Sequence, residues 1–188
     1  MVKKCEWPTG NELMIKYHDE EWGFPEHDDK GLFEFLVLES AQAGLSWLTI
    51  LKRREGYRRA FSSFDYEKVA GFTEKDVERL MKDEGIIRNR LKILSTISNA
   101  QKFIEVREEF GSFDKYIWGF VDGKQIVNNV KKMGEIPATT EISDEMSKDL
   151  KKRGFKFVGS TICYAFMQAA GLVNDHVIGC FRYGECGE

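Results

Sequence analysis

The sequence is poor in three residue types that mark particular classes of protein. Its 188 residues include only 3 prolines, 3 histidines and 4 cysteines. So few prolines leave most of the chain free to form helices. The cysteines lie far apart at uneven spacings, which is not the pattern of a small domain held together by disulfides.

The chain also lacks a long apolar segment and a surplus of positive charge. No hydrophobic run is long enough for a membrane helix or a signal peptide, so we expect a cytoplasmic protein without a membrane partner. The net charge of −3 excludes a uniformly basic surface. The basic residues are nevertheless clustered, which keeps nucleic acid a candidate partner: Lys52–Arg54, Arg58–Arg59, Arg88–Lys92 and Lys151–Arg153.

Helical periodicity is the main signal that the chain does contain. A length of 188 residues with 42% hydrophobic content suffices for one large domain or two small interlocked ones. Cap and stop signals predict helices over residues 28–43, 46–61, 73–83, 88–109, 143–153 and 160–171, with a short helix after Ser112. Residues 121–140 contain Gly123, Gly134 and Pro137 and are predicted to be irregular. The predicted fold class is all-α.

The predicted helix over residues 88–109 is amphipathic. Its apolar positions should face the core and its polar positions the solvent: Leu91, Leu94, Ile97 and Ile104 inward, and Lys92, Asn99 and Lys102 outward.

One acidic residue interrupts an apolar helix. Glu39 shares a face with Leu32 and Ala43, and no basic residue stands three or four positions away to pair with it. A carboxylate at such a position must be protonated, hydrogen-bonded, or facing a cation that is not always present. Two interpretations stay open: a core glutamate satisfied by backbone amides, or a site carboxylate that faces Trp47 across the turn.

Possible ligands for a soft metal ion lie at the two ends of the chain: Cys5, His18, His176 and Cys180. Two cysteines and two histidines complete a tetrahedral zinc shell, which is the structural kind of zinc site. Asp19 and Asp175 each follow or precede a candidate histidine and could accept a hydrogen bond from its outer nitrogen. The alternative is four unrelated buried residues.

A turn bounded by Gly154 and Gly159 joins the last two long helices. Backbone N–H groups at such a turn, just before a helix N-terminus, can hold a phosphate that nearby lysines attract. Phe155, Phe157 and Val158 are predicted to anchor the turn on the core. The alternative is an ordinary turn with a solvated, basic helix end.

Several segments together resemble a known family. YHDEEWG, LESAQAGLSW, GIIRNRLKI, RGFKFVGSTICYAFMQAAGLVNDH and the final H-x3-C are similar to those of 3-methyladenine DNA glycosylase I, in the helix-hairpin-helix DNA glycosylase superfamily. The resemblance runs in order from Cys5 to about Cys180. It implies a two-lobed all-α fold in a single glycosylase domain over residues 1–188, with the helix-hairpin-helix at about 143–171.

The resemblance also implies an activity and a set of site residues. The activity is base-excision repair: a monomer flips 3-methyladenine out of double-stranded alkylated DNA and releases it by hydrolysis. A structural zinc ion would join the termini through Cys5, His18, His176 and Cys180. The implied base-site residues are Glu39 as the catalytic residue and Tyr17, Trp47, Trp7 and Trp22 as substrate-binding residues. The implied DNA-binding residues are Lys151, Lys152, Gly154, Lys156, Gly159 and Ser160.

Two departures from the wider superfamily bear on mechanism. Many members carry an aspartate where this chain has Asn174, and Asp175 is the alternative candidate for its part. Members that also cut the strand carry a lysine after the hairpin, where this chain has Ser160 and Thr161, which predicts no lyase activity. Glu39 is expected to act in recognition, with a role in positioning water left open.

Two other functions stay open at this point. One is a glycosylase of the same superfamily for another lesion, which a panel of substrates would distinguish. The other is a zinc-stapled DNA-binding module without catalysis, which has no use for an unpaired Glu39 opposite Trp47.

Overall fold

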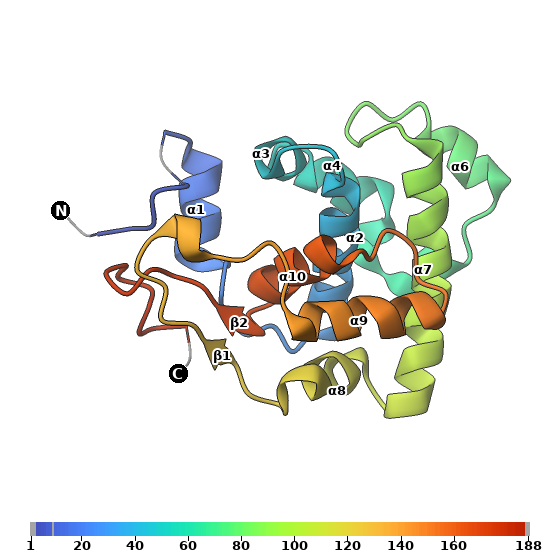
Figure 1. Cartoon of the computed structure of the whole chain (residues 1–188). Helices are drawn as coiled ribbons and strands as arrows, with labels where there is room; N and C mark the ends of the chain where they lie inside the picture. The colour runs from blue at the N-terminus through green and yellow to red at the C-terminus, as the bar shows by residue number, and fades with distance from the viewer. Residues whose placement is uncertain (1–2, 9, 187–188) are drawn as a thin grey trace.

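The computed structural model describes residues 3–8 and 10–186, and these residues are mostly helical (Figure 1). The α-helices, all short except α2, α7, α9 and α10, have the following bounds: α1 Glu12–Glu20, α2 Asp29–Gln42, α3 Trp47–Leu51, α4 Arg54–Ala60, α5 Tyr66–Ala70, α6 Glu74–Leu80, α7 Arg90–Phe110, α8 Phe113–Trp118, α9 Glu141–Lys152 and α10 Ser160–Ala169. Three 3-10 turns complete the helical structure: η1 Ser62–Phe64, η2 Gly119–Val121 and η3 Met133–Glu135. The predicted all-α class is confirmed.

The irregular segment contributes one short extended pairing. The strands β1 Ile126–Val127 and β2 Val173–Asn174 run parallel, with Ile126 opposite Val173. The two ends of the chain also meet, because the backbone N–H of Phe181 donates to the carbonyl of Lys3 at 3.0 Å. Both termini accordingly lie on the same side of the molecule (Figure 1).

Side-chain caps explain where several helices begin. Asp28 accepts a hydrogen bond from the N–H of Gly31 at the start of α2, and Ser46 accepts one from Thr49 at the start of α3. The predicted helix over 46–61 is instead two helices, α3 and α4, with Lys52 and Arg53 forming a turn between them; φ is −106° and ψ is 0° at Arg53. α9 begins earlier than predicted, since Thr140 is the cap and Ser143 completes its capping box.

The prediction for the faces of α7 is wrong at three positions. Its buried stripe follows Ile93, Ile97, Ala100, Phe103 and Val106. Leu91 is 68% exposed and Leu94 is 40% exposed, whereas Asn99 is only 2% exposed. Asn99 is buried without penalty because its amide donates to the carbonyl of Lys156 and accepts from the N–H of the same residue.

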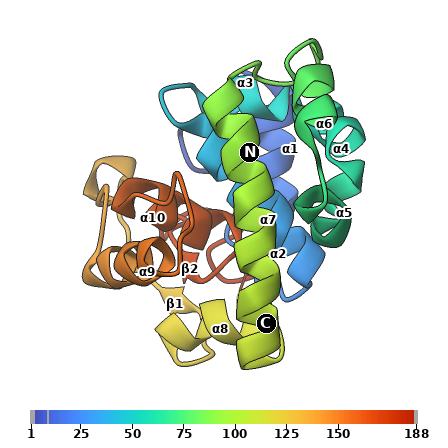
Figure 2. The same ribbon diagram turned by 90° about the vertical axis from the view of Figure 1, so that its right-hand side faces the viewer.

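Helices α2 and α7 stand between two groups of elements. Figure 2 shows α4, α5 and α6 on one side of α7 and α8, α9 and α10 on the other. Within these groups α5 packs along α7, and α10 packs against both α9 and α2. The end of α2 is thereby surrounded by α1, α3, α7 and the α9–α10 turn. No helix of the described part of the chain is long and apolar enough to cross a membrane.

The close approach of two glycines makes a test of this packing. A Cβ on Gly56 in α4 would lie 2.0 Å from the carbonyl oxygen of Gly85, a backbone atom that cannot move aside. We therefore expect Gly56→Ala to lower the free energy of unfolding by about 1–3 kcal/mol. Gly119→Ala is the control, because a Cβ there meets no atom within 4 Å and its φ is −58°. Equal urea midpoints for the two variants would contradict the packing.

Candidate active site and metal centre

A cavity of about 370 Å³ lies between the end of α2 and the segments that surround it. This volume is in the range of sites for small molecules. Its wall is mainly aromatic and apolar: Trp7, Met14, Tyr17, Trp22, Glu39, Gln42, Trp47, Met133, Ile136, Ala165 and Gln168. The structure thus places all five residues predicted for the base site around one cavity, although they come from four separate stretches of sequence.

Glu39 is the one carboxylate in the wall of this cavity. Its side chain is 97% buried (relative exposure 3%), and its Oε2 atom accepts no hydrogen bond from any described residue. Burial alone raises the pKa of Glu39 to about 8. Backbone amides therefore do not satisfy this oxygen, and an orphaned buried acceptor facing a cavity indicates a site for a hydrogen-bond donor or a cation.

Aromatic rings form the rest of the wall near Glu39. The rings of Tyr17 and Trp47 lie 5.1 Å apart between centroids, and Trp7 packs edge-on against Trp22 at 5.2 Å. The indole N–H groups of Trp7 and Trp47 are buried without a hydrogen-bond partner in the described chain. Burial, together with the charge of Glu39, raises the pKa of Tyr17 well above its usual value. The cavity therefore offers aromatic faces, unused N–H donors and one unused carboxylate oxygen.

The four predicted metal ligands form a single buried cluster. Their candidate ligand atoms all lie within 4.8 Å of one another. The Cys180 sulfur lies 3.5 Å from both His18 Nε2 and His176 Nδ1, and the Cys5 sulfur lies 3.6 Å from His176 Nδ1. Two thiols and two imidazoles converging in this way fit the four-ligand shell of a metal ion. The cluster joins the two ends of the chain, as predicted.

The outer nitrogens of both histidines are held by hydrogen bonds. His18 Nδ1 is 2.7 Å from Asp19 Oδ1, as predicted, and Asp19 is also paired with Lys4. His176 Nε2 instead donates to the backbone carbonyl of Trp22 at 2.9 Å. Burial lowers the pKa of His176 to about 4, so this imidazole is neutral and able to bind a metal at physiological pH.

The prediction for Asp175 is wrong. Its carboxylate does not contact His176 and accepts hydrogen bonds from Asn128, Tyr164 and Gln168, each at 2.7 Å. Gln168, one of these three donors, lines the cavity, whereas Asp175 is fully buried and is not among the lining residues. Asp175 is therefore a structural acceptor that orients Gln168, and it is not placed to act on a bound base. Asn174 is occupied in the same way, by the carbonyl of Tyr183.

The metal cluster and the cavity share a wall. Trp7 packs edge-on against His18 at 5.4 Å, and Trp22 packs edge-on against His176 at 4.7 Å. Gly23 has a φ of +83°, and a Cβ there would lie 3.2 Å from the His176 ring, so glycine permits this approach. The ligands thus support the cavity from its outer side.

The α9–α10 turn is fixed to its neighbours through its backbone. Gly154 has a φ of +94°, and Phe155 and Val158 are buried as predicted. Phe157 does not anchor the turn: its side chain is half-buried, while its carbonyl accepts a hydrogen bond from Ser40 Oγ at 3.2 Å. This carbonyl contact connects the turn to the end of α2, one residue from Glu39.

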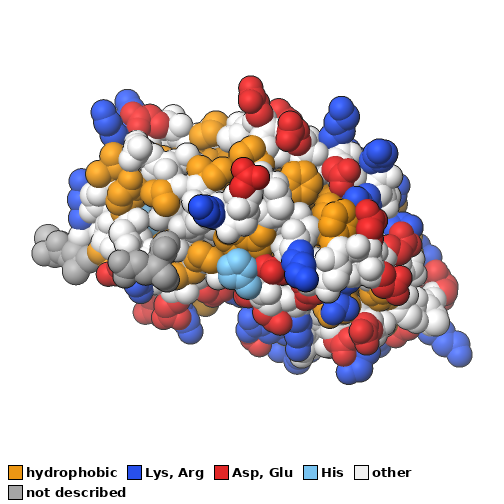
Figure 3. Space-filling view, turned by 90° about the horizontal axis from the view of Figure 1, so that it is seen from below, with side chains coloured by type: hydrophobic (Ala, Val, Ile, Leu, Met, Phe, Trp, Pro, Cys, Tyr) orange, Lys and Arg blue, Asp and Glu red, His pale blue; other side chains and the backbone are white. Residues whose placement is uncertain are grey.

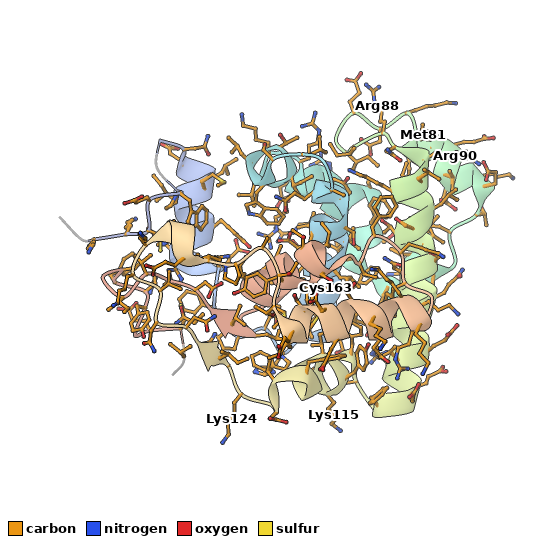
Figure 4. The ribbon with its side chains drawn as sticks, in the orientation of Figure 1. Met81, Arg88, Arg90, Lys115, Lys124 and Cys163 are labelled. Atoms are coloured by element: carbon orange, nitrogen blue, oxygen red, sulfur yellow. The ribbon has the colours of Figure 1, made fainter. Side chains whose placement is uncertain are left out.

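The turn presents unused amides and unpaired lysines. Within the described chain the N–H groups of Phe157, Val158 and Gly159 donate to no protein acceptor, and no side chain caps α10. Lys151, Lys152 and Lys156 are exposed and pair with no carboxylate of residues 3–8 and 10–186, although Arg153 is neutralised by Asp149 and Glu109. Cys163, on α10, lies in the interior beneath the turn, with its sulfur 3.5 Å from the carbonyl of Val158 (Figure 4).

Charges of both signs share the face of the molecule that lies below in Figure 1. On the face seen from below in Figure 1, basic and acidic side chains are interspersed around a band of hydrophobic ones (Figure 3). This face therefore has no uniformly positive potential that would attract an anion, in keeping with the net charge of −3.

Sequence reasoning missed part of the cavity wall. Gln42 could have been found, because it stands three residues after Glu39 and so lies on the same face of α2. Met133 and Ile136 come from the irregular segment, whose sequence has no period that assigns a face.

The combination of a helix-hairpin-helix unit, unused amides at its turn and an aromatic cavity with a buried carboxylate is typical of DNA glycosylases. Comparison with known proteins agrees. Residues 7–183 match the model of the methyladenine glycosylase family, and the chain belongs to this family.

Individual relatives cover nearly the whole chain. DNA-3-methyladenine glycosylase 1 of Escherichia coli strain K12 is 53% identical over 182 residues, which is 97% of each protein. DNA-3-methyladenine glycosylase of Haemophilus influenzae is 47% identical over 96% of this chain and 97% of the relative. The solved structure of 3-methyladenine DNA glycosylase I from Staphylococcus aureus superposes with a TM-score of 0.92 at 39% identity, covering 95% of each chain.

The raised pKa of Glu39 predicts how its replacement affects stability. An unfolded glutamate titrates near about 4.3, whereas burial raises the pKa of Glu39 in the folded protein to about 8. The folded state thus holds a proton that the unfolded chain releases, so the stability from this group is complete below the unfolded pKa and is lost as pH rises through the folded pKa.

Glu39→Gln should therefore stabilise the protein by an amount that grows between about pH 4 and pH 8, because glutamine does not titrate. Urea denaturation across this range measures the difference. Glu145→Gln, on the exposed side of α9, is the control. A gain that does not change with pH would show that Glu39 keeps an ordinary pKa.

Proposed function

We propose that this protein is a DNA base-excision repair glycosylase that releases 3-methyladenine from double-stranded alkylated DNA. The observation that carries the proposal is the buried Glu39 oxygen without a hydrogen-bond partner, in a cavity walled by Trp47, Tyr17 and Trp7. The names of the curated relatives, which are DNA-3-methyladenine glycosylases, support it. Glu39 binds the base together with these aromatic residues, and Trp22 supports them from behind.

The chemistry of the lesion explains why such a cavity selects it. Methylation at N3 gives the adenine of a nucleotide a positive charge and weakens its bond to the sugar. A cation is attracted by the aromatic faces and by a carboxylate that little water screens. Its arrival also favours ionisation of Glu39, whose pKa burial otherwise raises to about 8. Undamaged bases are neutral and gain neither attraction, and they cost more to flip out of the duplex.

Selection and rate have different origins in this scheme. Water attacks C1′ of the deoxyribose, the base leaves as neutral 3-methyladenine, and the proton of the water passes to solvent. Because the charge of the base disappears during this step, tighter binding of the cation does not by itself accelerate it. Glu39 therefore acts mainly in recognition and orientation. Ser160 and Thr161 stand where a lyase would need a lysine, so the strand is left intact.

The α9–α10 turn holds the DNA backbone. The free N–H groups of Phe157, Val158 and Gly159, with those of the first turn of α10, can donate to phosphate oxygens. Lys151, Lys152 and Lys156 add attraction that does not depend on base sequence. Gly154 and Ser160 complete this surface, Gly154 because its φ of +94° lets the chain reverse direction.

The metal held by the Cys5, His18, His176 and Cys180 cluster is zinc. Two buried thiols and two imidazoles suit zinc, and an ion held by all four would have no open position for a reacting water. Its part is structural, joining the two ends of a single domain over residues 1–188, of which residues 1–2, 9 and 187–188 lie outside the described chain. The curated relatives are bacterial, and we place this protein in the cytoplasm as a monomer.

Glu39→Gln is the first test of this function. The variant keeps the shape of the side chain but lacks the charge and one acceptor oxygen. The loss should be about 1–3 kcal/mol in binding of the base or in the transition-state free energy derived from kcat/KM for its release from methylated duplex. Affinity for undamaged duplex should not change, because phosphates supply it. Wild-type release of free base with an intact strand is the reference. Equal rates for a folded variant would make Glu39 a structural acid only.

The metal assignment predicts about one zinc ion per chain in elemental analysis. Cys180→Ser removes one ligand and should lose most of the zinc and unfold at lower temperature, because the two ends are no longer joined. Cys163→Ala is the matched control, since this cysteine is equally buried but lies outside the cluster. Zinc-free wild-type protein with unchanged thermal stability would rule out a structural metal.

The hairpin assignment predicts a particular salt dependence. Replacing Lys151, Lys152 and Lys156 by glutamine should weaken binding to every duplex by a similar factor and reduce the slope of log K against log salt by roughly 2–3. Lys115→Gln with Lys124→Gln is the control, because these exposed lysines lie at the lower edge of the molecule in Figure 4, outside the α9–α10 turn. If the triple variant keeps the wild-type slope, the hairpin lysines do not contact phosphates.

A further inference from the structure

The N-terminal part of α7 exposes apolar side chains beside the hairpin turn. Leu91 is 68% exposed and Leu94 is 40% exposed. Together with the side chains that face them they line a groove of about 490 Å³: Leu91, Leu94, Ser95, Ser98, Lys156 and Phe157. Apolar side chains that are exposed together mark an interaction site more often than a single exposed leucine does.

Phe157 is built into the groove by a strained and anchored backbone. Its φ of +54° is in the left-handed region, which is unfavourable for a bulky residue. The preceding residue is clamped by both ends of the Asn99 amide, and the carbonyl of Phe157 is held by Ser40. These contacts keep the phenyl ring beside Leu91 and Leu94 instead of in the core, and such strain is typical of functional positions.

The last turn of α2 separates this groove from the base cavity. On one side Glu39 and Gln42 line the cavity. On the other side the carbonyls of Ala41 and Ala43 each accept a hydrogen bond of 2.7 Å from the ammonium of Lys92, the neighbour of Leu91. A helix is about 10 Å across and duplex DNA rises about 3.4 Å per base pair. A duplex with one base in the cavity therefore reaches the groove within a few base pairs.

The charges around the groove favour DNA as the occupant. Among the residues that line it there is one cation, Lys156, which forms no ion pair in the described chain, and no carboxylate. The basic residues Arg88 and Arg90 lie near the start of α7, next to Leu91 in the sequence (Figure 4), although each is paired with an exposed glutamate. The groove therefore fits a ligand that has an apolar surface for the leucines and an anionic group for Lys156. A DNA backbone has both, because its deoxyriboses are largely apolar and its phosphates are anionic.

We propose that this groove is part of the DNA interface, where the sugars of a strand held by the hairpin rest on Leu91, Leu94 and Phe157. The inference rests on the proposed function. Apolar contacts of this kind stabilise a deformed duplex without neutralising phosphates. They should add affinity that is independent of salt, unlike the contribution of the hairpin lysines.

The test is the double variant Leu91→Ser with Leu94→Ser, which alters exposed positions only. Its affinity for a duplex that contains one abasic site should fall roughly tenfold, about 1.4 kcal/mol, with the slope of log K against log salt unchanged. Affinity for free 3-methyladenine and zinc content should equal those of the wild type. Val127→Ser, at a position 46% exposed in β1, is the control and should leave duplex affinity unchanged.

Two results would overturn the proposal. One is wild-type duplex affinity in the folded double variant. The other is a wild-type dimer in sedimentation that the double variant abolishes, because the groove would then belong to a second copy of the chain. Release of 3-methyladenine by the wild type, measured in parallel, tests the proposed function separately, since the effect on duplex affinity is scored whether or not the base is released.

Discussion

The burial of an unpaired carboxylate is the constraint that shapes the centre of this molecule. Glu39 lies in the wall of an aromatic cavity, and its Oε2 atom has no hydrogen-bond partner among the residues that the structure describes. Burial raises the pKa of Glu39 to about 8. Leaving an acceptor unsatisfied costs about 1–3 kcal/mol, and burying the charge costs more. The surrounding fold offsets this cost, because α2 is packed on almost every side. The aromatic wall offers water few hydrogen bonds, whereas it attracts a cation that binds beside Glu39.

The surroundings of Glu39 are fixed from two directions. On one side the ligand cluster that joins the chain ends supports Trp7 and Trp22 through the rings of His18 and His176. On the other side Lys92 and the hairpin backbone hold the end of α2. The cavity and the hairpin turn are therefore parts of one connected arrangement. A base that leaves the duplex does not have to wait for these walls to form.

The sequence predicted the elements that depend on local chemistry. Asp28 predicts the start of α2, because aspartate is a favourable N-cap. Helical spacing predicts that Glu39 has no basic partner on its own helix. The sequence could not predict contacts decided by distant segments. Asn99 is buried because its side-chain amide forms two hydrogen bonds with the backbone of Lys156 in the hairpin. The face of α7 that carries Asn99 is therefore turned inward, and Leu91 and Leu94 are exposed. Asp175 faces Tyr164 instead of His176, and the segment that supplies Met133 to the cavity wall carries no periodic signal.

The titration of the Glu39 carboxyl carbon by NMR tests the central claim most directly. In the free protein the carboxyl should titrate near pH 8, because burial raises its pKa to about 8. An adenine alkylated at both N3 and N9 is cationic and carries no sugar, so it can fill the cavity without reacting. With this probe bound, the pKa should fall by at least about 2 units, since a cation nearby favours the ionised form. If Glu39 titrates in the ordinary range of a glutamate, or if its pKa is unchanged when the cation binds, then Glu39 is not a buried carboxylate that recognises a cationic base.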